Sequence, residues 1–255
     1  MLRHPTIDKL NDMRLIGMAR SLQTQLNDDH INQLSFDERF GLLVDDEHTD
    51  RLNRRMQTRL RQARLRQSAA LEDIDYRSAR HLDKALIRQL ASCQWIQNKL
   101  NVLITGPTGV GKTFIACALA HQACREGHTV LYFRLPRLFA ELNIARADGR
   151  YPKLLNKLAR TQLLLLDDWG LATLNDEQRK DLLEITDDRH NQRATLITSQ
   201  LPVDQWHHVI AEPTLADAIL DRIVHNAYKI NLEGESMRKQ HSNLTKETQT
   251  HTVKT

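Results

Sequence analysis

One octapeptide constrains the fold of this 255-residue chain more than any other feature. It matches the pattern G-x-x-x-x-G-K-[ST] of a phosphate-binding loop. The apolar run 102–105 precedes it and a helical stretch to about residue 126 follows it, which is the strand–loop–helix context that such a loop requires. The octapeptide consists of Gly106, Pro107, Thr108, Gly109, Val110, Gly111, Lys112 and Thr113.

The residues of this loop predict a triphosphate site. Glycines let backbone N–H groups surround phosphates at the N-terminus of a helix. We expect Lys112 to reach the β- and γ-phosphates and Thr113 to offer its hydroxyl to Mg²⁺. The expected cofactors are therefore ATP and Mg²⁺, and the alternative interpretation is a flexible glycine-rich turn without a ligand.

From about residue 100 the pattern alternates between strands and helices. This alternation predicts an α/β fold in which helices cover both faces of a parallel sheet. After the first strand, the expected strands are 129–133, 163–166, 194–199 and 228–232, and the expected helices include 175–191 and 214–226.

Polar residues follow two of these strands. The carboxyl ends of parallel strands meet at the edge where ligands bind. We expect Asp167 to hold the water shell of Mg²⁺ and Asp168 to orient or deprotonate the attacking water, although two acids after a strand also occur as helix caps. Many related ATPases carry Glu at the second position, so the shorter Asp168 predicts hydrolysis that is slow or requires assembly. If the 194–199 strand lies between the other two, Gln200 is placed to sense the γ-phosphate, and an ordinary strand-end turn is the alternative.

Residues 1–70 are expected to form a small helical domain. Leu15, Met18, Leu22 and Leu26 recur at helical spacing. The segment 35–38 (Ser-Phe-Asp-Glu) is typical of a capping box that begins a helix. No proline between residues 5 and 107 interrupts the helices that follow.

An acidic segment, 45–50, is followed by a run of arginines without any acid. Glu47 and Asp50 lie four residues before Arg51 and Arg54, which favours one continuous helix. A helix over 51–66 spans about 24 Å, enough to reach phosphates over much of a DNA turn. The alternatives are a solvated helix face or a docking surface for a protein partner. The DNA-binding candidates are Arg51, Arg54, Arg55, Arg59, Arg61, Arg64 and Arg66.

Composition narrows the class of protein. Hydrophobic residues make up 40% of the chain, which supports a sizeable core, and the net charge of +4 is compatible with an acidic partner. The longest apolar run, 163–166, is too short to span a bilayer, and we expect no membrane partner. No signal-peptide pattern opens the chain, and three cysteines without CxxC spacing argue against a disulfide scaffold or zinc finger. The polar tail 241–255 is predicted to be disordered.

Five segments occur together in this chain: the phosphate-binding loop, 165–170 (LLDDWG), 198–202 (TSQLP), 216–222 (ADAILDR) and 234–238 (GESMR). Together they resemble the IstB-type transposition helpers, which are AAA+ ATPases related to the helicase loader DnaC. The resemblance implies a five-stranded AAA+ sheet of order 5-1-4-3-2 over residues 71–240. It also implies ATP-dependent homo-oligomers on double-stranded DNA, which assist a cognate transposase in target selection and insertion of a mobile element. Such a protein is expected in the bacterial cytoplasm, associated with the nucleoid.

The resemblance also implies functions for two arginines. Arg222 corresponds to the arginine finger, which would meet the γ-phosphate bound by a neighbouring subunit. Arg238 resembles a second sensor arginine. Two other functions remain open: a DnaC-like replicative helicase loader, and a small-molecule kinase, which would need an arginine-rich lid that the chain does not convincingly offer.

Overall fold

The computed structural model describes residues 4–77 and 80–237. The chain forms two compact units, an N-terminal unit of Met1–Arg59 and a C-terminal unit of Leu60–Thr255. The boundary between them falls inside a helix and precedes the predicted domain limit at residue 70. Within the described ranges, no helix combines the length and the apolar character needed to cross a membrane.

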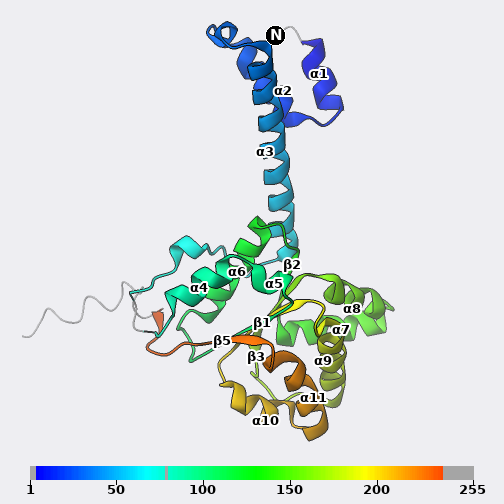
Figure 1. The fold of residues 1–255 in the computed structure, drawn as a ribbon. Helices are drawn as coiled ribbons and strands as arrows, with labels where there is room; N and C mark the ends of the chain where they lie inside the picture. The colour runs from blue at the N-terminus through cyan, green and yellow to red at the C-terminus, as the bar shows by residue number, and fades with distance from the viewer. Residues whose placement is uncertain (1–3, 78–79, 238–255) are drawn as a thin grey trace, which may run out of the picture. The chain divides into compact units, whose positions relative to one another are not determined.

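The N-terminal unit is helical, as predicted (Figure 1). The predicted capping box is confirmed, because the Glu38 amide donates to Ser35 Oγ at 3.3 Å and the Ser35 amide donates to the Glu38 carboxylate at 2.8 Å. The helices are α1 (Pro5–Asp12), α2 (Ile16–Leu26), the 3₁₀ turn η1 (Ile31–Gln33) and α3 (Phe36–Ala63), which continues past the unit boundary.

Buried Glu47 joins α2 to α3. Its carboxylate accepts the Gly17 amide at 2.8 Å at the start of α2, and its other oxygen accepts Arg51 Nε at 2.6 Å. A Cβ on Gly17 would lie 2.6 Å from Glu47 Cα, so the close approach of the two helices requires glycine. The acidic segment therefore caps α2 and stabilises α3, whose second predicted pair, Asp50 with Arg54 Nε, lies at 2.6 Å.

The predicted helix over 51–66 is wrong at its end. Helix α3 stops at Ala63, and Arg64 adopts a φ of +53°. Ala63 and Ala69 are buried in the core of the C-terminal unit and Leu65 packs against that core. Because a straight helix could not bury all three residues, Arg64 and Arg66 lie beyond α3 rather than on it.

The C-terminal unit contains the predicted parallel sheet. Its order is β2-β3-β4-β1-β5, which is the expected 5-1-4-3-2 read from the other edge. Pairing is parallel throughout, with Leu103 opposite Ile197 of β4 and Lys229 of β5. The strands are β1 (Asn101–Thr105), β2 (Val130–Arg134), β3 (Leu163–Trp169), β4 (Ala194–Ser199) and β5 (Ala227–Asn231).

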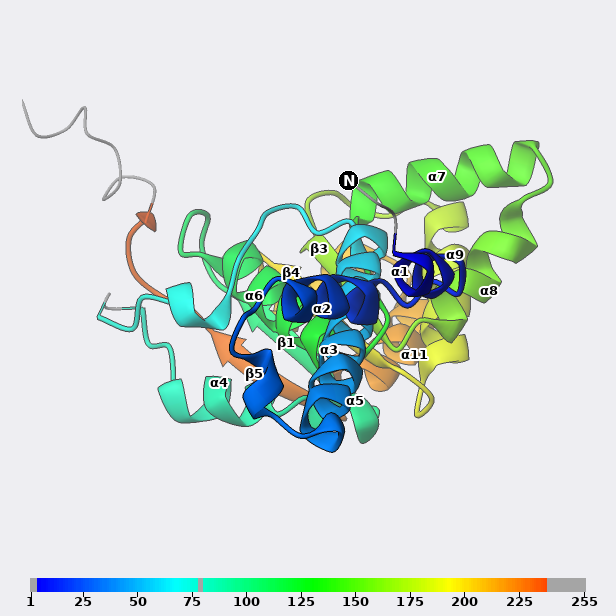
Figure 2. The ribbon, with the colours of Figure 1, turned by 90° about the horizontal axis from the view of Figure 1, so that it is seen from above.

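Helices cover both faces of this sheet (Figures 1 and 2). Side chains alternate along the strands: Ile104 joins the core under α6 and Leu103 the core under α7, α9 and α11. The first face carries η2 (Leu71–Asp73), α4 (Lys84–Ala91), α5 (Gln94–Gln97) and α6 (Lys112–Arg125). The second carries α7 (Leu135–Ala147), α8 (Tyr151–Arg160), α9 (Asp176–Arg189), η3 (Val203–Gln205), α10 (Trp206–Ile210) and α11 (Pro213–Val224).

Arg189, at the end of α9, makes hydrogen bonds to the end of α8, to the turn before β3 and to the start of β4. Its buried guanidinium donates to the carbonyl oxygens of Leu158, Thr161 and Ala194 and to the Thr195 hydroxyl. We expect Arg189→Met to lower the free energy of unfolding by about 3 kcal/mol, because these acceptors stay buried without a donor. Urea denaturation checks this, with exposed Arg193→Met as the control. A loss below about 1 kcal/mol would contradict the assigned role.

Candidate nucleotide-binding site

The predicted phosphate-binding loop joins β1 to α6. Gly106 and Gly111 have φ values of +143° and +94°, which other residues adopt with strain. Gly106 also has no room for a side chain, because a Cβ there would lie 2.2 Å from the Leu232 carbonyl oxygen; a Cβ on Gly111 would lie 2.6 Å from Arg80 Nη1 and would displace that guanidinium. The loop therefore requires glycine for backbone conformation and for packing.

Lys112 is folded along the inside of the loop. Its Nζ donates to the carbonyl oxygens of Gly106 and Pro107, both at 2.7 Å, and the residue is only 9% exposed. An ammonium group held at this place lies at the positive N-terminus of α6. This concentration of positive charge and backbone donors suits a polyphosphate.

Asp167, near the end of β3, is fully buried among hydroxyl groups. Its Oδ1 accepts Thr113 Oγ1 at 2.9 Å and also the Thr198 hydroxyl, while its Oδ2 accepts Tyr132 OH at 2.7 Å. Burial, and then the hydrogen bond to this carboxylate, raise the pKa of Tyr132. The structure brings the two predicted magnesium residues together, and a carboxylate beside a hydroxyl is a donor set that fits Mg²⁺.

Asp168 lies at an irregularity where β3 shifts its register against β4. Its φ is +63°, which is uncommon for a residue other than glycine. Its carboxylate accepts Arg134 Nε at 2.6 Å. Arg134 was missed from the sequence, although its position at the end of β2 places it at the same sheet edge as the two acids.

Gln200 directly follows β4, which lies between β3 and β1, so the condition on which its prediction depended is met. The Thr108 hydroxyl of the loop donates to Gln200 Oε1 at 2.7 Å. The side chain thus reaches the phosphate-binding loop from a neighbouring strand.

These residues surround one cavity of about 670 Å³, a size in the ordinary range for ligand sites. Lys112, Thr113, Asp168 and Gln200 line it together. Three arginines also line it. Sequence reasoning missed Arg80 and Arg134, and it predicted DNA contact for Arg66 rather than a place at this cavity.

Arg80 supports the loop from the side. The residue is 4% exposed, and its guanidinium donates to the Val110 carbonyl oxygen at 3.1 Å and to the Asp75 carbonyl oxygen at 2.6 Å. Desolvation by burial lowers the pKa of Arg80. On the other side, the Met237 amide donates to the Gly109 carbonyl oxygen at 3.0 Å. Arg238, the predicted second sensor, lies outside the described residues.

The sequence matches the family described as IstB-like ATP binding protein over residues 8–245. The chain belongs to this family. The insertion sequence ATP-binding protein y4pL of Sinorhizobium fredii (strain NBRC 101917 / NGR234) is 54% identical over 239 residues, which cover 94% of this chain and 98% of that protein. The insertion sequence IS21 ATP-binding protein of Pseudomonas aeruginosa is 31% identical over 229 residues, which cover 90% of this chain and 86% of that protein. Both relatives are named as ATP-binding proteins of insertion sequences.

Solved structures show that this IstB-like protein has the AAA+ fold. DnaI superposes with a TM-score of 0.56 at 24% identity, covering 66% of this chain and 92% of DnaI. The replication initiator DnaA, solved with AMPPCP and single-stranded DNA, superposes with a TM-score of 0.54 at 17% identity, covering 68% of this chain and 52% of DnaA. The predicted fold class is confirmed.

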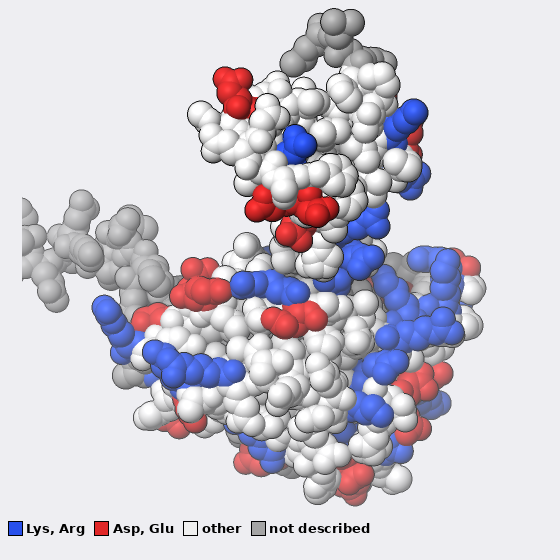
Figure 3. Space-filling view, turned by 45° about the horizontal axis from the view of Figure 1, so that its top comes forward, with Lys and Arg blue, Asp and Glu red and all other residues white. Residues whose placement is uncertain are grey.

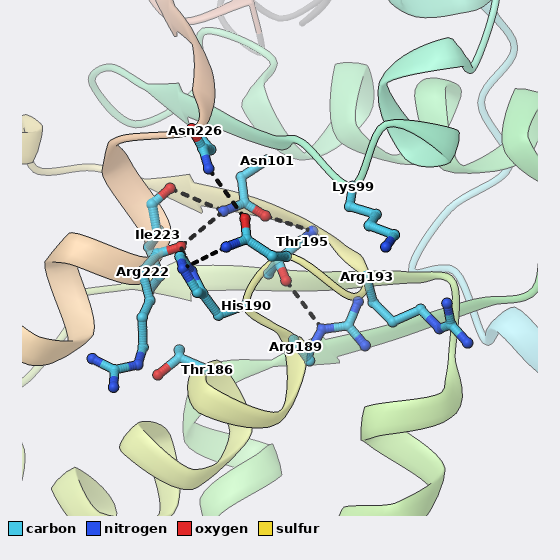
Figure 4. Close-up of a pocket in the computed structure, with 11 residues that line it drawn as sticks. Lys99, Asn101, Thr186, Arg189, His190, Arg193, Thr195, Arg222, Ile223 and Asn226 are labelled. Atoms are coloured by element: carbon cyan, nitrogen blue, oxygen red, sulfur yellow. Dashed lines mark hydrogen bonds between the residues drawn. The ribbon is translucent and has the colours of Figure 1, made fainter.

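In the IstB-like protein, Arg222 lies on α11, far from the chain's own phosphate-binding loop. Its carbonyl oxygen accepts the Asn101 side-chain amide at 3.3 Å, so it lies near the first residue of β1 (Figure 4). The loop follows the last residue of β1, about 13 Å further along the strand at ~3.3 Å per residue. The guanidinium extends away from Asn101 and pairs with Asp187 at 2.8 Å.

The predicted DNA-binding arginines fall into two groups. In the N-terminal unit, Arg51, Arg54 and Arg55 are exposed on α3 and Arg59 is half-buried. In the C-terminal unit, Lys and Arg side chains gather on the side where α7 and α8 lie (Figure 3). There a groove of about 600 Å³ is lined by Arg64, Arg66, Arg134 and Arg137. Arg61 is exposed near the end of α3.

Proposed function

We propose that this IstB-like protein is a Mg²⁺-dependent ATPase that oligomerises on double-stranded DNA and assists a transposase in target selection and insertion of a mobile element. The observation that carries the ATPase proposal is the convergence of Thr113, Asp168 and Gln200 on one cavity beside Lys112, with buried Asp167 hydrogen-bonded to Thr113. The insertion-sequence names of its relatives support the proposed link to transposition.

Each residue of the site has a separate task in this proposal. Lys112 exchanges two carbonyl acceptors for phosphate oxygens, and Thr113 and Asp167 hold Mg²⁺, which when bound would offset phosphate charge. Asp168 takes the proton of the attacking water once its carboxylate separates from Arg134, which at 2.6 Å otherwise occupies it. Gln200 presents its side-chain amide to the γ-phosphate.

Hydrolysis on this proposal needs a second subunit. Arg222 lies near the amino ends of the strands, whereas the phosphate-binding loop follows a carboxyl end. Since it cannot reach its own triphosphate without refolding, Arg222 acts in the site of a neighbouring copy. Arg238 completes the proposed site as a second sensor arginine.

The proposed DNA contact is made by the arginine run and is directed at phosphates. Arginines pair with phosphate oxygens in bidentate geometry, and this gives affinity without strong sequence preference. The exposed positions on α3 and at the turn after it support this assignment. Binding to duplex DNA would associate the protein with the bacterial nucleoid.

Asp168→Asn tests the proposed function. The variant is expected to bind ATP and to keep its oligomer on DNA, because the carboxylate that accepts the water proton is lost while the phosphate contacts remain. Gel-shift and phosphate-release assays measure both effects, and exposed Asp188→Asn serves as the control. For about five phosphate contacts per bound unit, log K should fall with a slope near −4.5 against log salt.

Three outcomes would contradict this function. Failure of Asp168→Asn to bind ATP would remove the role given to Asp168. Duplex affinity that is absent or insensitive to salt would remove the DNA half of the proposal. Strong capture of a replicative helicase with weak duplex binding would favour the alternative, a DnaC-like helicase loader.

A further inference from the structure

Arg66 reaches the proposed ATP site from outside the AAA+ motifs. The chain around it is anchored, because Ala63 and Ala69 are buried and Leu65 packs on the same core. Arg66 itself is on the solvent side of this segment, and its side chain is 44% exposed. It lines the cavity together with Lys112 and Thr113. The backbone is therefore held in place while a long cationic side chain can rotate at the cavity.

The contacts that Arg66 makes with the two acids are long. Its Nη1 lies 3.4 Å from Asp167 Oδ2 and 3.8 Å from Asp168 Oδ2. Both acids have shorter partners, since Asp167 accepts Thr113 at 2.9 Å and Asp168 accepts Arg134 at 2.6 Å. Both acids keep these shorter hydrogen bonds when the guanidinium moves. The charge of buried Asp167 would then need another cation, such as the proposed Mg²⁺.

We propose that Arg66 distinguishes ATP from ADP by binding the terminal phosphate within its own subunit. This inference rests on the proposed ATP site. It assigns Arg66 to the nucleotide rather than to DNA. It is also separate from the role of Arg222, which serves a neighbouring copy, because Arg66 acts in the monomer.

Electrostatic forces favour movement of the Arg66 guanidinium away from the two acids and toward the terminal phosphate. Thr113 and Asp167 would hold the divalent cation of a bound nucleotide, and its charge would repel the guanidinium of Arg66. A terminal phosphate near Lys112 offers negative charge and several acceptor oxygens in the same cavity. Since guanidinium groups match phosphate in bidentate geometry, Arg66 gains its strongest available partner only when the third phosphate is present.

Arg66→Gln tests the proposal against Arg125→Gln, a change of the same type on α6. The Arg125 side chain is 43% exposed, close to the 44% of Arg66, and it does not line the nucleotide cavity. Affinities for Mg²⁺–ADP and for a Mg²⁺-bound non-hydrolysable ATP analogue are measured by calorimetry on dilute monomer without DNA. We expect Arg66→Gln to lower the affinity for the ATP analogue about tenfold and the affinity for ADP less than about twofold. Arg66→Lys should recover part of the loss, and Arg125→Gln should leave both affinities unchanged.

The same measurements separate this inference from the proposed function. Equal weakening of both nucleotides by Arg66→Gln would show a merely structural role, and unchanged or tighter analogue binding would show that Arg66 does not contact the phosphate. Either result overturns the inference while the ATP site stands. Failure of the unmodified protein to bind either nucleotide would overturn both. If Arg66→Gln does not fold, the same two affinities are measured for Arg66→Lys. Affinities for the analogue and for ADP that change by the same factor would overturn the inference.

Discussion

Lys112→Ala is expected to lower ATP affinity by about 100-fold or more and, with it, to abolish assembly on DNA. The Nζ group lies inside the phosphate-binding loop, where it now makes two 2.7 Å hydrogen bonds to carbonyl oxygens. A bound triphosphate would take over these donors as charge-assisted bonds, worth about 1.5–3 kcal/mol each. Removing the ammonium group also leaves the phosphate charge uncompensated in a largely buried site.

Fluorescent-nucleotide titration measures the affinity, and sedimentation with and without duplex DNA measures the assembly. Lys157→Ala, an exposed lysine on α8, removes the same charge outside the cavity and should leave both properties intact. Retention of near-normal ATP affinity by Lys112→Ala would refute the assignment of this loop as the phosphate site. Normal assembly without nucleotide would instead uncouple ATP from oligomerisation.

Arg222→Ala is expected to leave ATP affinity of the monomer unchanged and to lower DNA-stimulated hydrolysis about 1,000-fold. The unchanged affinity follows from its position near Asn101, at the opposite sheet edge from the chain's own phosphate-binding loop. The loss of hydrolysis follows if the guanidinium offsets charge on the γ-phosphate held by a neighbouring copy. Asp187→Asn removes the ion pair to Arg222 but keeps the arginine, so it should retain hydrolysis.

A mixing experiment tests whether Arg222 acts between subunits. Arg222→Ala subunits keep an intact ATP site, and Lys112→Ala subunits keep an intact Arg222. Mixed oligomers should therefore regain part of the hydrolysis that each variant lacks alone. Co-assembled mixtures that stay inactive would argue against action in trans, and weakened ATP binding by monomeric Arg222→Ala would show a role in the same chain.

Local sequence patterns predicted those parts of the site that each consist of a few consecutive residues. The loop 106–113 and the acids Asp167 and Asp168 could be recognised because glycine conformation, helix N-termini and strand ends impose short-range requirements. The capping box at Ser35 and the pairs made by Glu47 and Asp50 followed from helical spacing alone. The strand order came from the family resemblance, and the sheet confirms it.

Long-range packing decided what these patterns could not. The helical spacing predicted that α3 continues to residue 66. The structure ends α3 at Ala63, because both Ala63 and Ala69 are buried in the core of the C-terminal unit. That turn brings Arg66 to the acids more than 100 positions later in the chain, and the pairing of β2 with β3 brings Arg134 to Asp168.

The sequence by itself determined that the chain carries a phosphate-binding loop, two acids near the end of a buried strand and an alternating α/β pattern. Only the tertiary structure decided which cations accompany those acids and that Arg222 lies far from its own loop. The physical reason is that backbone conformation and side-chain periodicity depend on neighbours along the chain, whereas the partner of a charged side chain depends on which strands and turns the core brings together.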